Sequence, residues 1–244
     1  MVARLDSISI FPAMFEGLKN WGITARALKN KRWAHENFNP RDFATNNYQQ
    51  IDDRPYGGGA GMVMMAEPLD WAIQQARAFQ QAQGVKKSRV LYLSAQGRVF
   101  NQQKTLDFLD FLQQNGGLIF LCGRYEGVDE RLLESSVDEE LSLGDFVLSG
   151  GELAAMAVMD SLIRQLPGAL NSPDSLKEES FSAGAGKMLE YPQYTRPEVF
   201  KGMRVPEILL SGNHAEIARW RENQARQRTK ERRPDLFISN GIVD

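Results

Sequence analysis

The sequence has little cysteine, little histidine and no long apolar run. Cys122 is its single cysteine, which excludes an internal disulfide, and His35 and His214 are too few to complete a Cys/His metal cluster. The longest purely apolar run, residues 153–159, is far shorter than a membrane span. The first ten residues lack the continuous apolar segment of a signal peptide. The sequence therefore predicts a cytoplasmic, reduced protein without structural zinc or a membrane partner.

Net charge is also small, but it is unevenly distributed. The 244 residues carry 29 basic and 31 acidic side chains, a net charge of −2. Residues 129–160 contain nine acidic side chains and one basic, whereas residues 219–233 contain seven basic and two acidic. A polyanion responds to local basic density within a Debye length. The basic run predicts either a nucleic-acid contact or a solvated helix face.

Strand-like and helix-like patterns alternate over the first two thirds of the chain. Short apolar runs predict strands, and apolar residues spaced three or four apart predict helices between them. This alternation indicates an α/β fold with a largely parallel sheet. The predicted strands cover residues 5–10, 90–93, 118–121 and 146–148; the predicted helices begin at Pro68, include Leu106, Leu109 and Leu112, and cover residues 152–166.

The remaining third has few aliphatic runs and contains a basic helix. Proline, glycine and polar residues from Pro167 onward predict a linker, which divides the chain into a domain at 1–170, a flexible linker at 171–178 and a helical domain at 179–244. Asn213 and Glu216 have the spacing of a capping box and predict the start of the basic helix. Ile217 and Trp220 give that helix only a narrow apolar stripe.

Three glycine-rich turns could bind a ligand. They lie at residues 54–61, 122–127 and 141–152, and the second directly follows a predicted strand. None has the lysine of a P-loop or the Gly-x-Gly-x-x-Gly spacing of a dinucleotide site. On spacing alone, each is explained better as a plain turn than as a ligand site. Ligands collect at the carboxyl ends of strands in open α/β sheets, so the position of two of these turns favours a shared pocket.

Charged side chains supply the candidates for chemistry. Asp160 and Arg164 are four residues apart on a predicted helix and share a face, although an ordinary intrahelical pair has the same spacing. Glu178 and Glu179 follow the linker, where a solvated carboxylate is the simplest interpretation. No serine or cysteine nucleophile has an evident base.

Five motifs, taken together, resemble one known family. They occur in the family's order over essentially the whole chain, and the family is that of the bacterial tRNA (guanine-37-N1)-methyltransferases. The resemblance implies a trefoil-knotted α/β domain of the SPOUT class, a linker and a small helical C-terminal domain. It also implies a homodimer with its active site at the subunit interface. The motifs are residues 53–59 (DRPYGGG), 121–131 (LCGRYEGVDER), 144–152 (GDFVLSGGE), 194–199 (YTRPEV) and 210–217 (LSGNHAEI).

The resemblance implies that S-adenosylmethionine is the methyl donor and that backbone groups of three loops hold it within the knot. Such a ligand is an adenosine with a sulfonium, so the glycine-rich turns need no phosphate-binding fingerprint. The implied donor-binding residues are Tyr92, Leu93, Gly97, Gly123, Tyr125, Glu126, Gly127, Ser142, Leu143, Gly144, Phe146, Leu148, Gly150 and Gly151.

The resemblance also implies which side chains carry the reaction. Guanine N1 is weakly nucleophilic until its proton leaves, and a positioned general base contributes about 10²–10⁴-fold. An arginine can stabilise the negative charge that develops on O6. The family's arginine matches Arg164, and the position of its basic aspartate is occupied here by Glu179. We expect Glu179, and not Glu178 or Asp174, to be the base.

The chain departs from the family at three more positions. Ala60, Ala95 and Ala154 stand where the family commonly has proline. Alanine leaves the backbone freer, so ordering each loop on binding costs up to about 1 kcal/mol more. The family's methyl transfer requires Mg²⁺, and the sequence leaves open whether a carboxylate such as Glu126 binds it.

The basic helix gains a role from the resemblance. Its arginines are expected to contact phosphates of the tRNA anticodon stem-loop, where extrusion of the target base from its stack costs little. Three alternatives remain at this point: a knotted methyltransferase acting on another base or a ribose, a non-catalytic RNA-binding module, and a nucleotide-dependent oxidoreductase, which would lack its fingerprint. The expected RNA-binding residues are Arg219, Arg221, Arg226 and Arg228.

Overall fold

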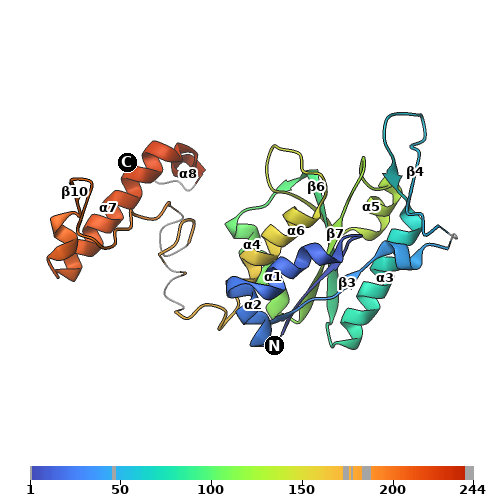
Figure 1. The fold of residues 1–244 in the computed structure, drawn as a ribbon, viewed down its shortest axis with the longest axis horizontal. Helices are drawn as coiled ribbons and strands as arrows, with labels where there is room; N and C mark the ends of the chain where they lie inside the picture. Colours follow the sequence, from blue (N-terminus) through green and yellow to red (C-terminus); the bar gives the residue numbers. More distant parts are fainter. Residues whose placement is uncertain (1, 46–47, 173–175, 177, 183–187, 240–244) are drawn as a thin grey trace. The chain divides into compact units, whose positions relative to one another are not determined.

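A computed structural model describes residues 2–45, 48–172, 176, 178–182 and 188–239. The chain divides into two compact units, Met1–Asn171 and Ser172–Asp244 (Figure 1). None of the described helices is long and apolar enough to cross a bilayer.

A parallel sheet forms the centre of the first unit. Its strand order is β2-β1-β7-β6-β8, and β3 also pairs with β1. Every pairing within this sheet is parallel, which confirms the predicted α/β class with a largely parallel sheet. The strands are β1 (Ala3–Ile8), β2 (Trp33–Ala34), β3 (Asn37–Phe38), β6 (Lys87–Val99), β7 (Gly116–Cys122) and β8 (Glu139–Ser142).

Helices cover both faces of this sheet (Figure 1). Leu118 and Phe120 of β7 pack in one apolar cluster with α4, α6, α1 and α2, while Ile119 and Leu121 pack in the other with α3 and α5. These four side chains are fully buried, and each contributes roughly 1.5–3 kcal/mol relative to exposure. The helices are α1 (Glu16–Asn20), α2 (Gly22–Lys29), α3 (Ala66–Ala82), α4 (Gln102–Gln113), α5 (Glu130–Ser136) and α6 (Glu152–Ile163), with short 3-10 turns at Pro12–Phe15 and Pro40–Phe43.

A buried ion pair interrupts the apolar packing of β1. The Nη2 atom of Arg4 lies 2.7 Å from Oδ1 of Asp6, and the side chain of Asp6 has no exposed surface. Gln80 of α3 donates from Nε2 to Oδ2 of Asp6 at 2.9 Å. Burial raises the pKa of Asp6 above its ordinary value, although the hydrogen bond from Arg4 opposes that rise.

One predicted strand is absent, and the predicted helix that includes Leu106, Leu109 and Leu112 is confirmed as α4, with Leu106 outside its buried face. Residues 146–148 form no strand, because the sheet position beside β6 is taken by β8. Val147 is 87% exposed. Leu106 is also exposed, since α4 buries Thr105 and Phe108 on its sheet-facing side.

Helix boundaries also shift from their expected places. The helix α3 begins at Ala66, two residues before Pro68, whose missing N–H costs nothing there because the first turn has no intrahelical acceptor. At its other end, α6 stops at Ile163, short of the predicted residue 166.

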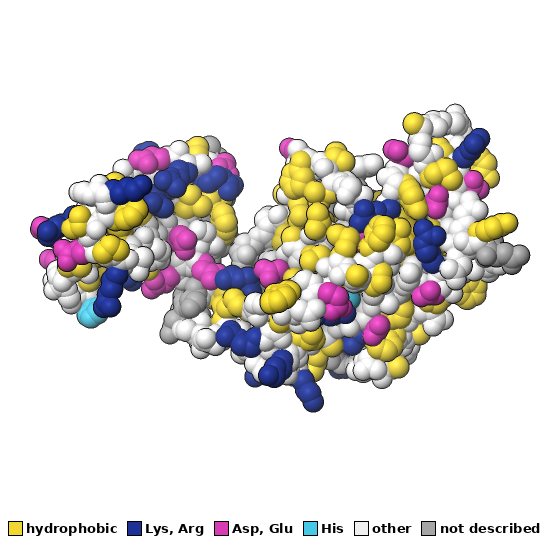
Figure 2. Space-filling model, viewed as in Figure 1, with side chains coloured by type: hydrophobic (Ala, Val, Ile, Leu, Met, Phe, Trp, Pro, Cys, Tyr) yellow, Lys and Arg dark blue, Asp and Glu magenta, His cyan; other side chains and the backbone are white. Residues whose placement is uncertain are grey.

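The second unit is built around one long helix. The helix α7 (His214–Arg232) starts where the capping box predicted, with Oδ1 of Asn213 accepting from the N–H of Glu216 at 3.3 Å. Its buried residues are Ala225 and Thr229, and many arginines and lysines of this unit face solvent (Figure 2). The other elements are the antiparallel pair β9 (Val199–Phe200) and β10 (Met203–Arg204), a 3-10 turn at Glu207–Leu210, and α8 (Pro234–Ser239).

Candidate active site

A cavity of about 230 Å³ lies at the carboxyl ends of β7 and β8, next to residues 92–96 in the middle of β6. We name the segments that line it the first loop (residues 94–97), the second loop (residues 123–127) and the third loop (residues 143–151). Twelve of the fourteen predicted donor-binding residues border this cavity; Gly97 and Gly144 do not. Further bordering residues that the sequence did not single out as donor-binding are Ser94, Ala95, Gln96, Arg124, Leu141, Val147, Ser149 and Ala154.

A bulge in β6 creates the first loop. Leu93 and Arg98 both pair with Leu141 of β8, so the residues between them leave the ladder. Bulges re-aim side chains in this way at the edges of active sites. Gly97 makes the return of the strand possible, because a Cβ at this position would lie 2.4 Å from the backbone N of Leu141.

The second and third loops approach each other through their backbones. The N–H of Gly151 donates to the carbonyl of Gly123 at 3.0 Å. A Cβ on Gly151 would lie 2.9 Å from the Cα of Cys122, and one on Gly123 would lie 2.8 Å from the hydroxyl of Tyr92. Side chains at either position would close this cradle, which therefore suits a ligand held by main-chain groups.

Two tyrosines border the cavity with different protonation properties. Burial, followed by the charges of Glu140 and Glu130, raises the pKa of Tyr92 to about 12. Tyr125 has a backbone φ of 57°. Its pKa is raised first by desolvation and then by Asp52, with which its hydroxyl forms a hydrogen bond.

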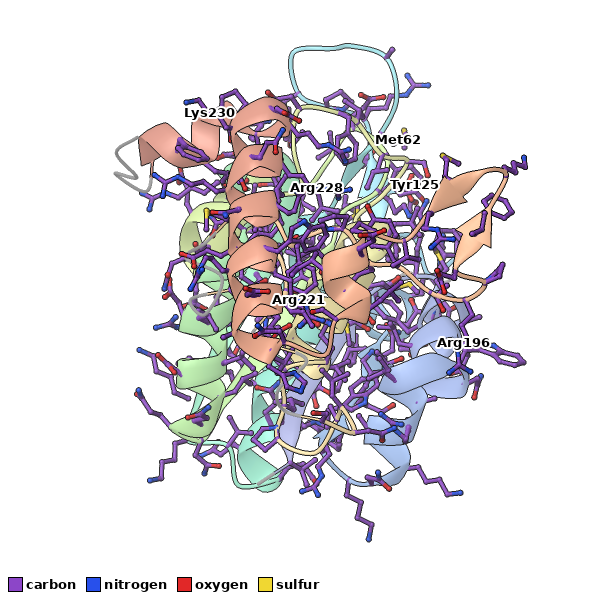
Figure 3. All side chains as sticks on the ribbon, turned by 90° about the vertical axis from the view of Figure 1, so that its left-hand side faces the viewer. Met62, Tyr125, Arg196, Arg221, Arg228 and Lys230 are labelled. Carbon is purple, nitrogen blue, oxygen red and sulfur yellow. The ribbon has the colours of Figure 1, made fainter. Side chains whose placement is uncertain are left out.

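The glycine-rich segment at residues 54–61 lies next to the second loop rather than in the cavity lining. The N–H of Glu126 donates to the carbonyl of Met62 at 2.9 Å, and Met62 and Tyr125 lie at the same edge of the unit (Figure 3). A Cβ on Gly61 would lie 2.3 Å from Oε1 of Glu126. The shape of this segment therefore depends directly on the second loop.

Among the described residues, no reactive thiol lines the cavity and no cluster of metal ligands is found. Cys122 is fully buried beneath it, and burial raises the pKa of its thiol well above the ordinary value. No group of three or more potential metal ligands occurs among the described residues. Glu126 is the carboxylate that borders the cavity.

The two predicted catalytic residues lie in different units. Arg164 follows the last residue of α6 and is half-buried, and its N–H donates to the carbonyl of Asp160 at 3.1 Å. Glu179 lies in the second unit, where its carbonyl accepts from the N–H of Ser182 at 3.1 Å. The joint action of Arg164 and Glu179 on one substrate therefore stays a prediction.

The neighbouring carboxylate is already engaged within the second unit. Oε2 of Glu178 accepts from the hydroxyl of Tyr191 at 2.5 Å and lies 3.8 Å from Nη1 of Arg221. A carboxylate held in this way is a poor mobile base. Asp174, which was also not expected to be the base, lies outside the described residues.

The four arginines predicted to bind RNA all lie on α7, and they differ in exposure. Arg219 and Arg226 are exposed, whereas Arg221 and Arg228 are half-buried. Figure 3 shows Arg221 and Arg228 at successive heights along the helix. The guanidinium of Arg221 lies 4.6 Å from the centre of the Tyr191 ring. Replacing Arg221 therefore also removes packing.

Comparison with known proteins gives a consistent family assignment. Residues 3–239 match the family described as "tRNA (Guanine-1)-methyltransferase TrmD". The chain is 52% identical over 235 residues to a "tRNA (guanine-N(1)-)-methyltransferase" from Burkholderia ambifaria and to one from Burkholderia vietnamiensis, covering 96% of this chain and 86% of each relative. A relative of the same name from Burkholderia mallei is 52% identical over 234 residues, with the same coverage. The chain therefore belongs to the tRNA (guanine-1)-methyltransferase family.

Proposed function

We propose that this protein transfers a methyl group from S-adenosylmethionine to N1 of the guanine at position 37 of tRNA, on the 3′ side of the anticodon. The observation that carries the proposal is the cavity that three loops form at the ends of parallel strands, in a chain of this family. Family membership supports the methyl transfer and the tRNA substrate.

The donor site consists of the cavity-lining residues of the three loops. Backbone groups of Gly123, Gly127, Gly150 and Gly151 would hold an adenosine-bearing ligand, because the absence of side chains at these positions exposes the main chain. The donor supplies an electrophilic methyl group on a positively charged sulfur. Tyr92 adds a neutral hydroxyl to one wall.

Proton removal from guanine N1 falls to Glu179 in this proposal. The carboxylate accepts the N1 proton, and the electron pair of that N–H bond attacks the methyl carbon to form the N1–methyl bond. The bond between that methyl group and sulfur breaks, and its electron pair stays on the sulfur of the departing thioether. Arg164 donates to O6 and stabilises the negative charge that accumulates there. General-base catalysis of this kind contributes about 10²–10⁴-fold.

The second unit supplies RNA contacts. Arg219, Arg221, Arg226 and Arg228 would bind phosphates of the anticodon stem-loop, which positions the substrate without reading its sequence. Residues 171–178 would act as the linker between the 1–170 and 179–244 domains. The trefoil knot in the first domain stays an expectation from the family.

We also place the active site at the interface of a homodimer. Trp21 and Leu153 are 76% and 50% exposed, and large apolar side chains at these positions suit burial by a second copy. Mg²⁺ stays an expectation from the family, and Glu126 is the carboxylate in the cavity lining that would hold it.

Methylation of defined tRNA transcripts tests the proposed function. A transcript with guanine at position 37 should accept one methyl group, and a matched transcript with adenine there should accept none. Nearest-neighbour mapping of the product should find 1-methylguanosine. A methyl group on another base or on a ribose would contradict the proposal, as would absence of transfer to the guanine transcript.

A further inference from the structure

An ion pair between Arg124 and Glu152 joins two walls of the cavity. Nη2 of Arg124 lies 2.8 Å from Oε2 of Glu152. The Glu152 side chain has no exposed surface, and the Arg124 side chain is 17% exposed. Arg124 belongs to the second loop, and Glu152 is the first residue of α6, directly after the third loop. Removing either partner would leave the other charge buried without its counterion, which is strongly unfavourable.

The Arg124 side chain also forms a hydrogen bond with the backbone of the third loop. Its Nη1 donates to the carbonyl of Ser149 at 3.1 Å. Gly150 has no side chain where the guanidinium passes, because a Cβ there would lie 2.3 Å from Nε of Arg124. On the other side, the guanidinium lies 4.5 Å from the centre of the Phe11 ring. The third loop therefore wraps around the Arg124 side chain.

Glu152 is fixed from the opposite direction. Ser9, which directly follows β1, donates from Oγ to Oε1 of Glu152 at 2.6 Å. Both oxygens of the Glu152 carboxylate are thus engaged, one by Ser9 and one by Arg124. Ser9 is 1% exposed, so this network is shielded from water and little screened by salt.

We propose that Arg124 and Glu152 form a positioning pair that sets the separation and shape of the second and third loops and thereby the affinity for the methyl donor. This inference rests on the proposed function, because it takes the cavity as the donor site. The Arg124 side chain contacts Glu152, the carbonyl of Ser149 and, from Nη2, Sδ of Met14 at 3.4 Å. Through these contacts the pair shapes the loops, and it acts on the donor in that way. We assign it no role in proton transfer or RNA binding.

The test compares donor affinity with stability in four variants. Arg124→Gln, Arg124→Lys, Glu152→Gln and the Arg124→Gln/Glu152→Gln double variant are titrated with S-adenosylmethionine by calorimetry, and their melting temperatures are recorded. We expect each glutamine single variant to raise the dissociation constant about tenfold, within the range of couplings inside one hydrogen-bond network. Arg124→Lys keeps the charge but cannot contact Glu152 and Ser149 through two separate nitrogens, so its loss should be smaller than that of Arg124→Gln.

The buried pair Arg4–Asp6 supplies a matched control. Its side chains are 10% and 0% exposed, it lies in the same unit, and neither residue borders the cavity. Asp6→Asn should lower the melting temperature about as much as Glu152→Gln does. It should leave the dissociation constant for S-adenosylmethionine within about twofold of the wild-type value, as expected for distant sites.

The outcomes separate the two proposals. If the wild-type protein fails to bind S-adenosylmethionine, the proposed function is wrong. If the wild type binds and the Arg124 and Glu152 variants bind equally well, the positioning role is wrong. It is also wrong if Asp6→Asn weakens binding as much as Glu152→Gln does. A double variant whose loss equals the product of the two single losses would show that the residues act independently, which contradicts a pair.

Discussion

The two units of this chain differ in how much buried structure lies beneath their candidate sites. In the first unit, the cavity stands on a sheet with an apolar cluster on each face, and its strand β7 is buried along its whole length. In the second unit, the buried residues among those described are Ala225 and Thr229, and the arginines of α7 face outward or are half-buried. The proposed donor site is therefore built on core packing, whereas the proposed RNA-binding surface has few buried residues to define it.

The largest expected effect comes from a substitution in the second unit that lowers the rate of methyl transfer without changing donor binding in the first. Glu179→Gln removes the proton acceptor and should lower the single-turnover rate of methyl transfer by about 10²–10⁴-fold, as loss of a general base does. Its affinity for S-adenosylmethionine should be unchanged, because the donor cavity belongs to the first unit.

Glu178→Gln is the matched control for that experiment. Glu178 is held by Tyr191 and Arg221, so its replacement should cost only a modest fraction of the rate. Equal, mild losses in the two variants would rule out Glu179 as the base.

Core substitutions should affect the units to different degrees. Phe120 is fully buried in β7, and Phe120→Ala should lower the free energy of unfolding by about 3–5 kcal/mol. Thr229→Val removes the hydroxyl that accepts from the N–H of Leu189 at 2.9 Å and should cost about 1–2 kcal/mol. Chemical denaturation measures both values. A larger loss in Thr229→Val would contradict the contrast between the units.

Stability should fall as the pH is lowered, because of one half-buried histidine. His35 stacks on Phe15 at 5.0 Å, and burial, followed by the charges of Lys19 and Arg4, lowers its pKa to about 3. As the pH falls, His35 is therefore protonated near pH 6.5 in the unfolded chain but only near pH 3 in the folded protein. Between pH 6.5 and 5 this difference removes about 2 kcal/mol of stability.

His35→Gln checks the origin of that pH dependence. Denaturation curves at pH 7 and pH 5 should show a smaller loss in the variant than in the wild type. An equal loss in both proteins would place the titrating group elsewhere.

The RNA-binding surface should be sensitive to salt, and the donor site should not be. Replacing Arg219, Arg221, Arg226 and Arg228 with glutamine should flatten the dependence of log affinity for tRNA on log salt by about three to four units, close to one per lost phosphate contact. Affinity for S-adenosylmethionine should be unaltered. Unchanged tRNA affinity in this variant would exclude α7 as the RNA contact.

The smallest expected effect concerns the freedom of the first loop. Ala95 lies in the β6 bulge and borders the cavity. Ala95→Pro should tighten donor binding by at most about 0.4–1 kcal/mol, because proline reduces the entropy lost on ordering. A large loss of affinity in calorimetry would show that this backbone does not accept proline.

Local patterns predicted those parts of the fold that depend on neighbours in the sequence. The runs at 90–93 and 118–121 lie within β6 and β7, and the capping box marks the start of α7. The strand β8 was missed because it begins with Glu139 and Glu140, two acidic residues that do not resemble a buried strand.

The sequence predicted the candidate site only at those residues that belong to recognisable motifs. The glycine-rich turns indicated a shared pocket, and the family resemblance supplied most of its lining. The bulge in β6 and the contact of Arg124 with Glu152 depend on tertiary neighbours that no periodicity encodes. The action of Glu179 on a substrate next to Arg164 is likewise a prediction of the resemblance alone.

A crystal structure of the protein with a non-reactive donor analogue and a tRNA anticodon hairpin tests the central claim most directly. The account predicts that the Glu179 carboxylate lies within hydrogen-bonding distance of N1 of the guanine, about 2.6–3.2 Å, with the Arg164 guanidinium at O6. A structure that places the guanine next to the donor and Glu179 out of its reach would contradict the account.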